Sequence, residues 1–135
     1  MRKIAFLFIS FTILLAVLTG CTSKIEQIEP NNVEKVEIAF VPEGYDYART
    51  YTDREKIGRI VSYLNGLRVK DRFPENPDEY CGGAYTLVLT LADGTQREFI
   101  HFGNMFLRET GGDWKRMTYE QASELDRLVR AMPSD

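Results

Sequence analysis

Two amphipathic helical segments, each with a single apolar stripe, limit the folds open to this chain. In both segments apolar residues recur at three- and four-residue spacing, the pattern of a helix that buries one side. Such helices can cover only one face of a sheet, so the pattern favours a helix layer packed on β-strands. The stripes consist of Ile57, Ile60, Val61 and Leu64 in the first segment and Ala122, Leu125, Leu128, Val129 and Met132 in the second.

Local signals predict where both helices begin and end. Thr52 is expected to be the N-cap of the first helix, with Glu55 completing a capping box, and the same type of box begins at Thr118. We expect Gly66 to end the first helix as a left-handed residue after the last turn. Pro133 is expected to end the second helix.

The other regular segments have the pattern of β-strands. Val36, Ile38 and Phe40 alternate with more polar residues, which predicts a half-buried strand. Residues 47–51 predict a second, more polar strand. Residues 70–81 contain two prolines and several acidic residues and are expected to form a mobile loop.

The dipeptide at 93–94, Asp-Gly, sets the expected register of the strands that follow. A two-residue hairpin turn there pairs Leu87 with Ile100. A second two-residue turn at 103–104 pairs Ile100 with Leu107. This register places one apolar set on the helix side of the sheet: Tyr85, Leu87, Leu89, Ile100, Phe102, Met105 and Leu107.

A three-residue loop at 111–113 then pairs Leu107 with Met117 and completes the order ββαβββ(β)α. We therefore predict a two-layer α+β domain over residues 33–135. Its sheet is expected to be mostly antiparallel, with two helices on one face.

The same register predicts aromatic and arginine side chains on the helix-free face. These residue types are enriched at binding hot spots, and a guanidinium group can grip a carboxylate with two hydrogen bonds. The candidate binding face consists of Arg97, Phe99, His101, Phe106, Arg108, Trp114 and Arg116. The alternative is that these aromatics reflect strand propensity and are covered by the first strands or the long loop.

The N-terminus predicts export from the cytoplasm. Basic residues at 2–3 precede an apolar run over 4–18, which is shorter than the roughly 20 residues that span a membrane. The run ends in Leu18-Thr19-Gly20-Cys21, which resembles the lipobox of bacterial lipoproteins. This resemblance implies that residues 1–20 are a cleaved signal peptide and that Cys21 carries acyl chains such as palmitate. The alternative is an uncleaved signal anchor with an ordinary cysteine.

Lipidation of Cys21 would place the chain on the cell membrane, facing away from the cytoplasm, because two or more acyl chains anchor stably. Residues 21–32 are then expected to be a flexible tether, and the 11 residues Thr22–Asn32 would reach about 35–40 Å when extended. Without residues 1–20 the chain has 15 basic and 20 acidic residues, a net charge of −5. This charge argues against nucleic acid as a partner and against electrostatic binding to anionic lipid.

Few residues suggest catalytic or metal-binding chemistry. Cys81 is the only thiol left once Cys21 is acylated, and we expect it to be a small buried residue. His101 is the sole histidine and lacks ligand spacing for zinc. We therefore expect no metal, no cofactor and no enzymatic activity.

These features favour a non-enzymatic lipoprotein domain that binds a protein or cell-wall component through the candidate face. One alternative is an enzyme inhibitor or sensor accessory protein that acts through the loop at 70–81. A second is a small hydrolase that uses Cys81 or a carboxylate. Beyond the signal, the layout resembles small bacterial lipoprotein domains of unassigned function, in the capped helix ending Leu64-Asn65-Gly66-Leu67 and the strand, Asp-Gly turn and strand that follow.

Overall fold

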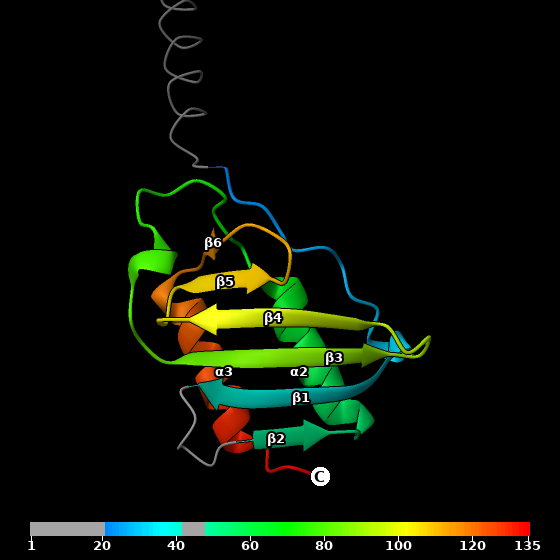
Figure 1. Ribbon diagram of the computed structural model, residues 1–135. Helices are drawn as coiled ribbons and strands as arrows, with labels where there is room; N and C mark the ends of the chain where they lie inside the picture. The colour runs from blue at the N-terminus through cyan, green and yellow to red at the C-terminus, as the bar shows by residue number, and fades with distance from the viewer. Residues whose placement is uncertain (1–20, 42–47) are drawn as a thin grey trace, which may run out of the picture.

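The computed structural model describes residues 21–41 and 48–135, so the predicted signal peptide lies outside the described residues. Its strands pair antiparallel in one sheet of order β2-β1-β3-β4-β5-β6, with two helices behind it (Figure 1). The predicted α+β class is confirmed. The elements are β1 (Val33–Val41), β2 (Ala48–Tyr51), α2 (Arg54–Gly66), β3 (Ala84–Leu91), β4 (Gln96–Phe102), β5 (Phe106–Glu109), β6 (Lys115–Arg116) and α3 (Tyr119–Ala131).

The main core lies between the helices and the face of the sheet that they cover, called here the inner face. Alternate residues of β1, β3 and β4 point into this core, because successive side chains of a strand project to opposite faces. The predicted stripes of both helices meet them there. The most deeply buried members include Val36, Ile38, Leu87, Leu89, Phe99, Ile60, Leu64 and Leu125. Among the described residues, neither α-helix lies on the opposite face, which is called the outer face (Figure 1).

The start of α2 differs from the prediction by one residue. Asp53, not Thr52, is the N-cap, and its carboxylate accepts hydrogen bonds from the backbone N–H groups of Glu55 and Lys56, both at 3.0 Å. Thr52 instead donates its N–H and hydroxyl to the carboxylate of Asp135. Aspartate caps a helix as well as threonine does, and Thr52 has another partner.

The end of α2 also differs from the prediction, whereas α3 begins as expected. Gly66 belongs to the last turn of α2 and does not have the positive φ of a left-handed cap. Leu67 follows in an extended conformation and is buried, which takes the chain back into the core. In α3 the capping box between Thr118 and Gln121 is present, which confirms that prediction.

The hairpin between β3 and β4 has a three-residue loop, so the predicted two-residue turn is wrong. The Leu91 N–H donates to the Thr95 carbonyl at 2.8 Å, and Gly94 takes a φ of +83°. A three-residue loop that ends in a left-handed glycine is another common hairpin connection. Leu87 therefore pairs with Phe99 instead of Ile100. A shift of one residue moves every side chain of β4 to the opposite face.

The next two turns shift as well. The loop after β4 also has three residues, with positive φ at Gly103 and Asn104, and Leu107 pairs with His101. Between β5 and β6, Leu107 lies opposite Lys115, which is two residues before Met117, the predicted partner. The one-residue register shifts in the turns before and after β4 cancel for the strand that follows. The two-residue shift between β5 and β6 leaves each side chain on its predicted face, and Leu107 is buried as predicted. Within the predicted inner set, Ile100 and Phe102 lie on the opposite face, and Met105 lies in the loop between β4 and β5.

The segment predicted to be a free tether packs against the domain. Ser23 forms a β-bridge with Val69, and Ile25 and Ile28 are buried in the core. The side chain of Asn65 accepts from the Ile28 N–H at 2.9 Å and donates to its carbonyl at 2.8 Å. The expectation of a flexible tether up to Asn32 is therefore corrected: the packed part of the described chain begins near Ser23. This packing is stabilised by burial of the two isoleucine side chains and by the two hydrogen bonds of the Asn65 side-chain amide.

Candidate functional site

The seven residues of the predicted binding face are divided between the two faces of the sheet. Arg97, Phe99 and His101 lie on the inner face, because the one-residue shift turns β4 around. The prediction that these three are outward-facing is wrong. The other four lie on the outer face as the register requires: Phe106, Arg108, Trp114 and Arg116.

The three residues on the inner face are occupied by contacts within the domain itself. Phe99 is fully buried, and the guanidinium carbon of Arg97 lies 5.2 Å from its ring centroid. Arg97 also forms two hydrogen bonds with the Glu109 carboxylate, at 2.6 and 2.9 Å, which raise the pKa of Arg97. Its third contact is a hydrogen bond to the Glu26 carbonyl. This arginine therefore fastens the N-terminal segment to the sheet.

His101 is a buried, uncharged histidine. Its side chain is 3% exposed, and its Nε2 atom has no hydrogen-bond partner among the described residues. Burial lowers the pKa of His101 to about 4, while hydrogen bonding to the backbone at His101 and Ala122 and the Asp126 carboxylate act in the opposite direction. Tyr85, which packs edge-on against the imidazole, donates its hydroxyl to Asp126 at 2.7 Å.

A cluster of aromatic rings forms at one end of the outer face, and we call it the outer aromatic cluster. Phe106 is its centre and is 3% exposed, because the rings of Phe73 and Tyr80 lie over it at 5.6 and 6.1 Å. Phe102 packs against Trp114 at 6.1 Å. Two of these rings come from the loop at 70–81, so the loop covers part of the face.

Charged groups fix this loop on the sheet. The Asp78 carboxylate accepts a hydrogen bond from Trp114 Nε1 at 2.9 Å and lies 3.5 Å from Arg108. The Arg108 guanidinium carbon is also 4.3 Å from the Trp114 ring centroid, a cation–π distance. Arg116 pairs with Glu75 at 2.9 Å. The loop therefore makes contacts with the sheet along its length, and its predicted mobility stays a prediction.

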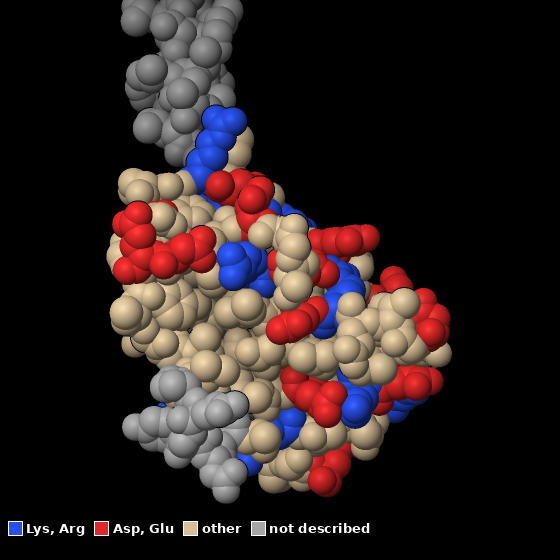
Figure 2. Space-filling model, viewed as in Figure 1, with Lys and Arg blue, Asp and Glu red and all other residues tan. Residues whose placement is uncertain are grey.

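The two surfaces predicted as alternatives are thus one continuous surface. The sheet aromatics and the loop residues interdigitate, so deletion of the loop would also expose Phe106. Figure 2 shows this face with an uncharged area on one side, next to a group of acidic side chains, and with charges of both signs on the other. Apolar side chains that remain half-buried there include Val88, Ile100 and Phe102.

Three aromatic residues of this surface are not among the seven predicted from the sequence: Phe73, Tyr80 and Phe102. The first two are aromatic residues within an otherwise polar, proline-containing segment, and aromatic side chains bury a large apolar area when they pack against a partner. Phe102 was missed for another reason, since the predicted register sent it to the inner face.

The structure does not bring together Cys81 and His101, which the cysteine version of the hydrolase alternative would require. Cys81 is exposed, so the expectation that it is buried is wrong. It follows a short 3₁₀ turn at Pro77–Glu79 on the loop, where no apolar segment covers it. His101 is buried on the inner face and forms no hydrogen bond with Cys81. A cysteine nucleophile needs a base within hydrogen-bond reach, and His101 does not supply it.

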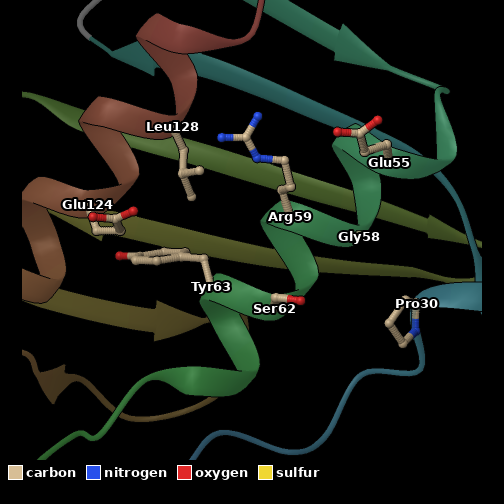
Figure 3. Close-up of a pocket in the computed structure, with 8 residues that line it drawn as sticks. All are labelled: Pro30, Glu55, Gly58, Arg59, Ser62, Tyr63, Glu124 and Leu128. Carbon is tan, nitrogen blue, oxygen red and sulfur yellow. The ribbon is translucent and has the colours of Figure 1, made fainter.

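A separate shallow groove lies between the helices on the other side of the molecule (Figure 3). The ring of Tyr63 extends from α2 across the groove toward Glu124 of α3, with Arg59 and Leu128 above it (Figure 3). Burial and the nearby Glu124 carboxylate raise the pKa of Tyr63 above its usual range. This tyrosine stays protonated and fills the space between the helices.

Comparison with protein-family models, with curated proteins and with solved structures finds no match to this chain. Over residues 21–41 and 48–135, no helix has the length and apolar character needed to cross a membrane. Within the same residues, no cluster of three or more His, Cys, Asp or Glu side chains has the arrangement of a metal site.

Proposed function

We propose that this chain is a lipoprotein domain, anchored by acyl chains on Cys21, that binds a protein partner through the outer aromatic cluster and the adjoining outer face. The membrane itself is its first partner, through the lipid, and the domain faces away from the cytoplasm. The observation that supports the binding role most strongly is the outer aromatic cluster beside Arg108. Aromatic and arginine side chains that are half-buried on a rigid sheet are typical anchors of protein interfaces.

The packing of residues 23–32 adds a geometric condition to this proposal. A tether that docks on the domain cannot extend, so the anchored chain stays close to the membrane. Its partner therefore lies at or in the same membrane, and a soluble component far from the surface is disfavoured.

Photo-crosslinking in cells tests the binding role. A crosslinking amino acid replaces Phe102 in one variant and Arg127, an exposed residue of α3, in a matched control. We expect a discrete crosslinked partner from position 102 and none from position 127. The same pattern from both positions, or no crosslink from 102 in a correctly folded protein, would contradict the proposal.

The anchor is tested separately by the mass of the purified chain. We expect a chain that begins at Cys21 and carries the mass of its acyl groups. An intact N-terminus with an unmodified thiol would contradict lipidation and leave the outer-face experiment to be judged by itself.

The accessory or inhibitor role is a second candidate because the loop adds its own exposed residues to the same surface. Tyr80 is 49% exposed and Cys81 is exposed beside it. Replacement of Tyr80 by Ala distinguishes the two roles. Loss of the crosslinked partner in that variant would favour a contact centred on the loop, and retention would favour the sheet.

A further inference from the structure

A basic hollow lies at the end of the molecule where Cys21 emerges. Two β-bridges bring three chain segments together there: Ser23 pairs with Val69, and Lys70 pairs with Arg116. The second bridge has reciprocal backbone hydrogen bonds of 2.9 Å, so these segments extend the sheet beyond β6. Figure 1 shows β6 and the start of the long loop at the same end as residue 21, with β2 and the C-terminus opposite.

The hollow has a volume of about 340 Å³ and a lining rich in positive charge. Arg68, Lys70 and Arg116 contribute cations, and Met105 and Met117 contribute apolar surface. Within the part of the chain that the structure describes, no Asp or Glu lines this hollow. The groove between the helices, in contrast, is lined by Glu55 and Glu124.

The cations differ in how much of their charge is already neutralised. Arg116 pairs with Glu75, which holds its guanidinium in place. Arg68 and Lys70 are exposed and form no ion pair with any described residue. Two unneutralised cations beside a fixed arginine favour an anionic ligand, and such groups attract phosphate through charge-assisted hydrogen bonds.

The rim of the hollow has the residues of a membrane interface. Thr22, directly after the predicted lipid attachment site, lines it together with Tyr119. Tyr119 is 68% exposed, the highest exposure among the large apolar side chains described. Tyrosine prefers the boundary between water and lipid, where its ring is apolar and its hydroxyl is wet.

We propose that this hollow binds the phosphate headgroup of an anionic phospholipid in the membrane that carries the anchor. The proposal rests on the lipidation of Cys21 stated above. Because the segment after Cys21 is bridged to Val69, the acyl chains and the hollow reach the membrane from the same end of a rigid body. The domain would then have a fixed orientation on the membrane. The net charge of the chain conceals this local concentration of positive charge.

Hydrogen exchange of the acylated full chain in nanodiscs tests this inference. One set of nanodiscs contains phosphatidylcholine alone, and in the others phosphatidylglycerol replaces part of it. We expect the amides of residues 68–70 and 116–121 to be protected as phosphatidylglycerol increases. The double variant Arg68→Gln/Lys70→Gln should raise the phosphatidylglycerol fraction for half-maximal protection at least about fivefold, since each basic residue near an anionic surface contributes roughly that factor.

The control variant Arg59→Gln/Arg130→Gln removes the same charge from exposed positions on the helix side and should behave like the unmodified chain. Protection that is equal in both lipids, or that survives loss of Arg68 and Lys70, would overturn the proposal. Inorganic phosphate added to phosphatidylcholine nanodiscs should have little effect. If it protects as well as phosphatidylglycerol does, the ligand is free phosphate and the membrane proposal fails. The mass of the chain reports separately on Cys21, so failure of the anchor and failure of the hollow are distinguishable.

Discussion

The two faces of the sheet are built from similar residues but are covered to different degrees. The inner face contains Phe99 and His101 under two helices, and both are almost completely buried. The outer face contains Phe102 and Trp114, and both are only partly covered. Residue type alone therefore does not predict how deeply a side chain is buried in this chain. The helices cover the inner face, whereas the loop at 70–81 covers only one end of the outer face.

The two faces also differ in the kind of contacts that cover them. The inner face meets apolar side chains, whose burial supplies most of the folding free energy. The outer face meets a loop held by the rings of Phe73 and Tyr80 and by the ion pairs of Asp78 and Glu75. Ion pairs that remain in contact with solvent are individually weak. We therefore expect the cover of the outer face to open at a lower free-energy cost than the cover of the inner face.

The largest expected effect compares one phenylalanine from each face. Phe99→Ala removes a fully buried ring and should lower the free energy of unfolding by about 3–5 kcal/mol. Phe102→Ala removes a half-buried ring and should cost only about 1–2 kcal/mol. Urea unfolding followed by circular dichroism measures both, with an unchanged denaturant slope as the control. Equal costs would show that the outer face is part of the folding core.

The second effect tests the buried, neutral state of His101. The pKa of His101 is about 4 in the folded chain and near 6.5 when unfolded, so the unfolded state binds the proton first as the pH falls. Its contribution to stability is complete above pH 6.5 and is lost progressively as the pH falls toward 4. The loss amounts to about 3 kcal/mol at most.

Unfolding free energies at several pH values between 4 and 6.5 measure this effect. In the variant His101→Leu the slope over this window should largely disappear, whatever the variant's own stability. A wild-type chain with a flat profile would show that solvent reaches the imidazole, and the inner face would then be less sealed than its burial indicates.

The sequence predicts the helix layer well and the sheet register poorly, for physical reasons. A helix stripe averages over many residues, so an error of one at the cap, as between Thr52 and Asp53, leaves its buried side unchanged. A strand has a period of two, so an extra loop residue at Ala92 exchanges Phe99 and Ile100 between faces. Asp-Gly occurs in two- and three-residue hairpin loops alike, and the dipeptide alone does not distinguish them.

The one-residue error in the predicted register of β4 also changes the candidate site. Four of its seven predicted residues lie on the outer face, because they come after the compensating turn at Gly103. The packing of the loop and of Ile25 and Ile28 was not visible in local patterns, since both depend on partners distant in the sequence. An apolar residue in a polar segment was the available signal in each case.

The third prediction concerns the loop between β3 and β4, whose length determines which residues of β4 lie on the inner face. Gly94→Ala places a side chain at φ +83°, where L residues are strained, and should cost about 1–2 kcal/mol. Gly66→Ala is the matched control: it has the same open space around it but lies in a helix without positive φ. It should stabilise the chain by about 0.5–1 kcal/mol. Opposite signs in thermal unfolding are expected, and stabilisation by both substitutions would contradict the three-residue loop.

The smallest expected effect concerns the loop that covers the outer face. Asp78→Ala removes the acceptor of Trp114 Nε1 and the partner of Arg108, yet should change global stability by no more than about 0.5 kcal/mol. Its effect should be local: the Tyr80 amide, bonded to the Pro77 carbonyl, should exchange faster with solvent.

The variant Asp78→Asn sharpens this test because its side-chain oxygen still accepts the Trp114 hydrogen bond. It should exchange at an intermediate rate if the indole contact holds the loop, and like Asp78→Ala if the charge on Arg108 does. The Leu89 amide, deep in β3, is the internal reference and should be unaffected in both variants. If the Leu89 amide exchanges faster together with the loop, the cover of the outer face unfolds with the core, and the two faces form one cooperative unit.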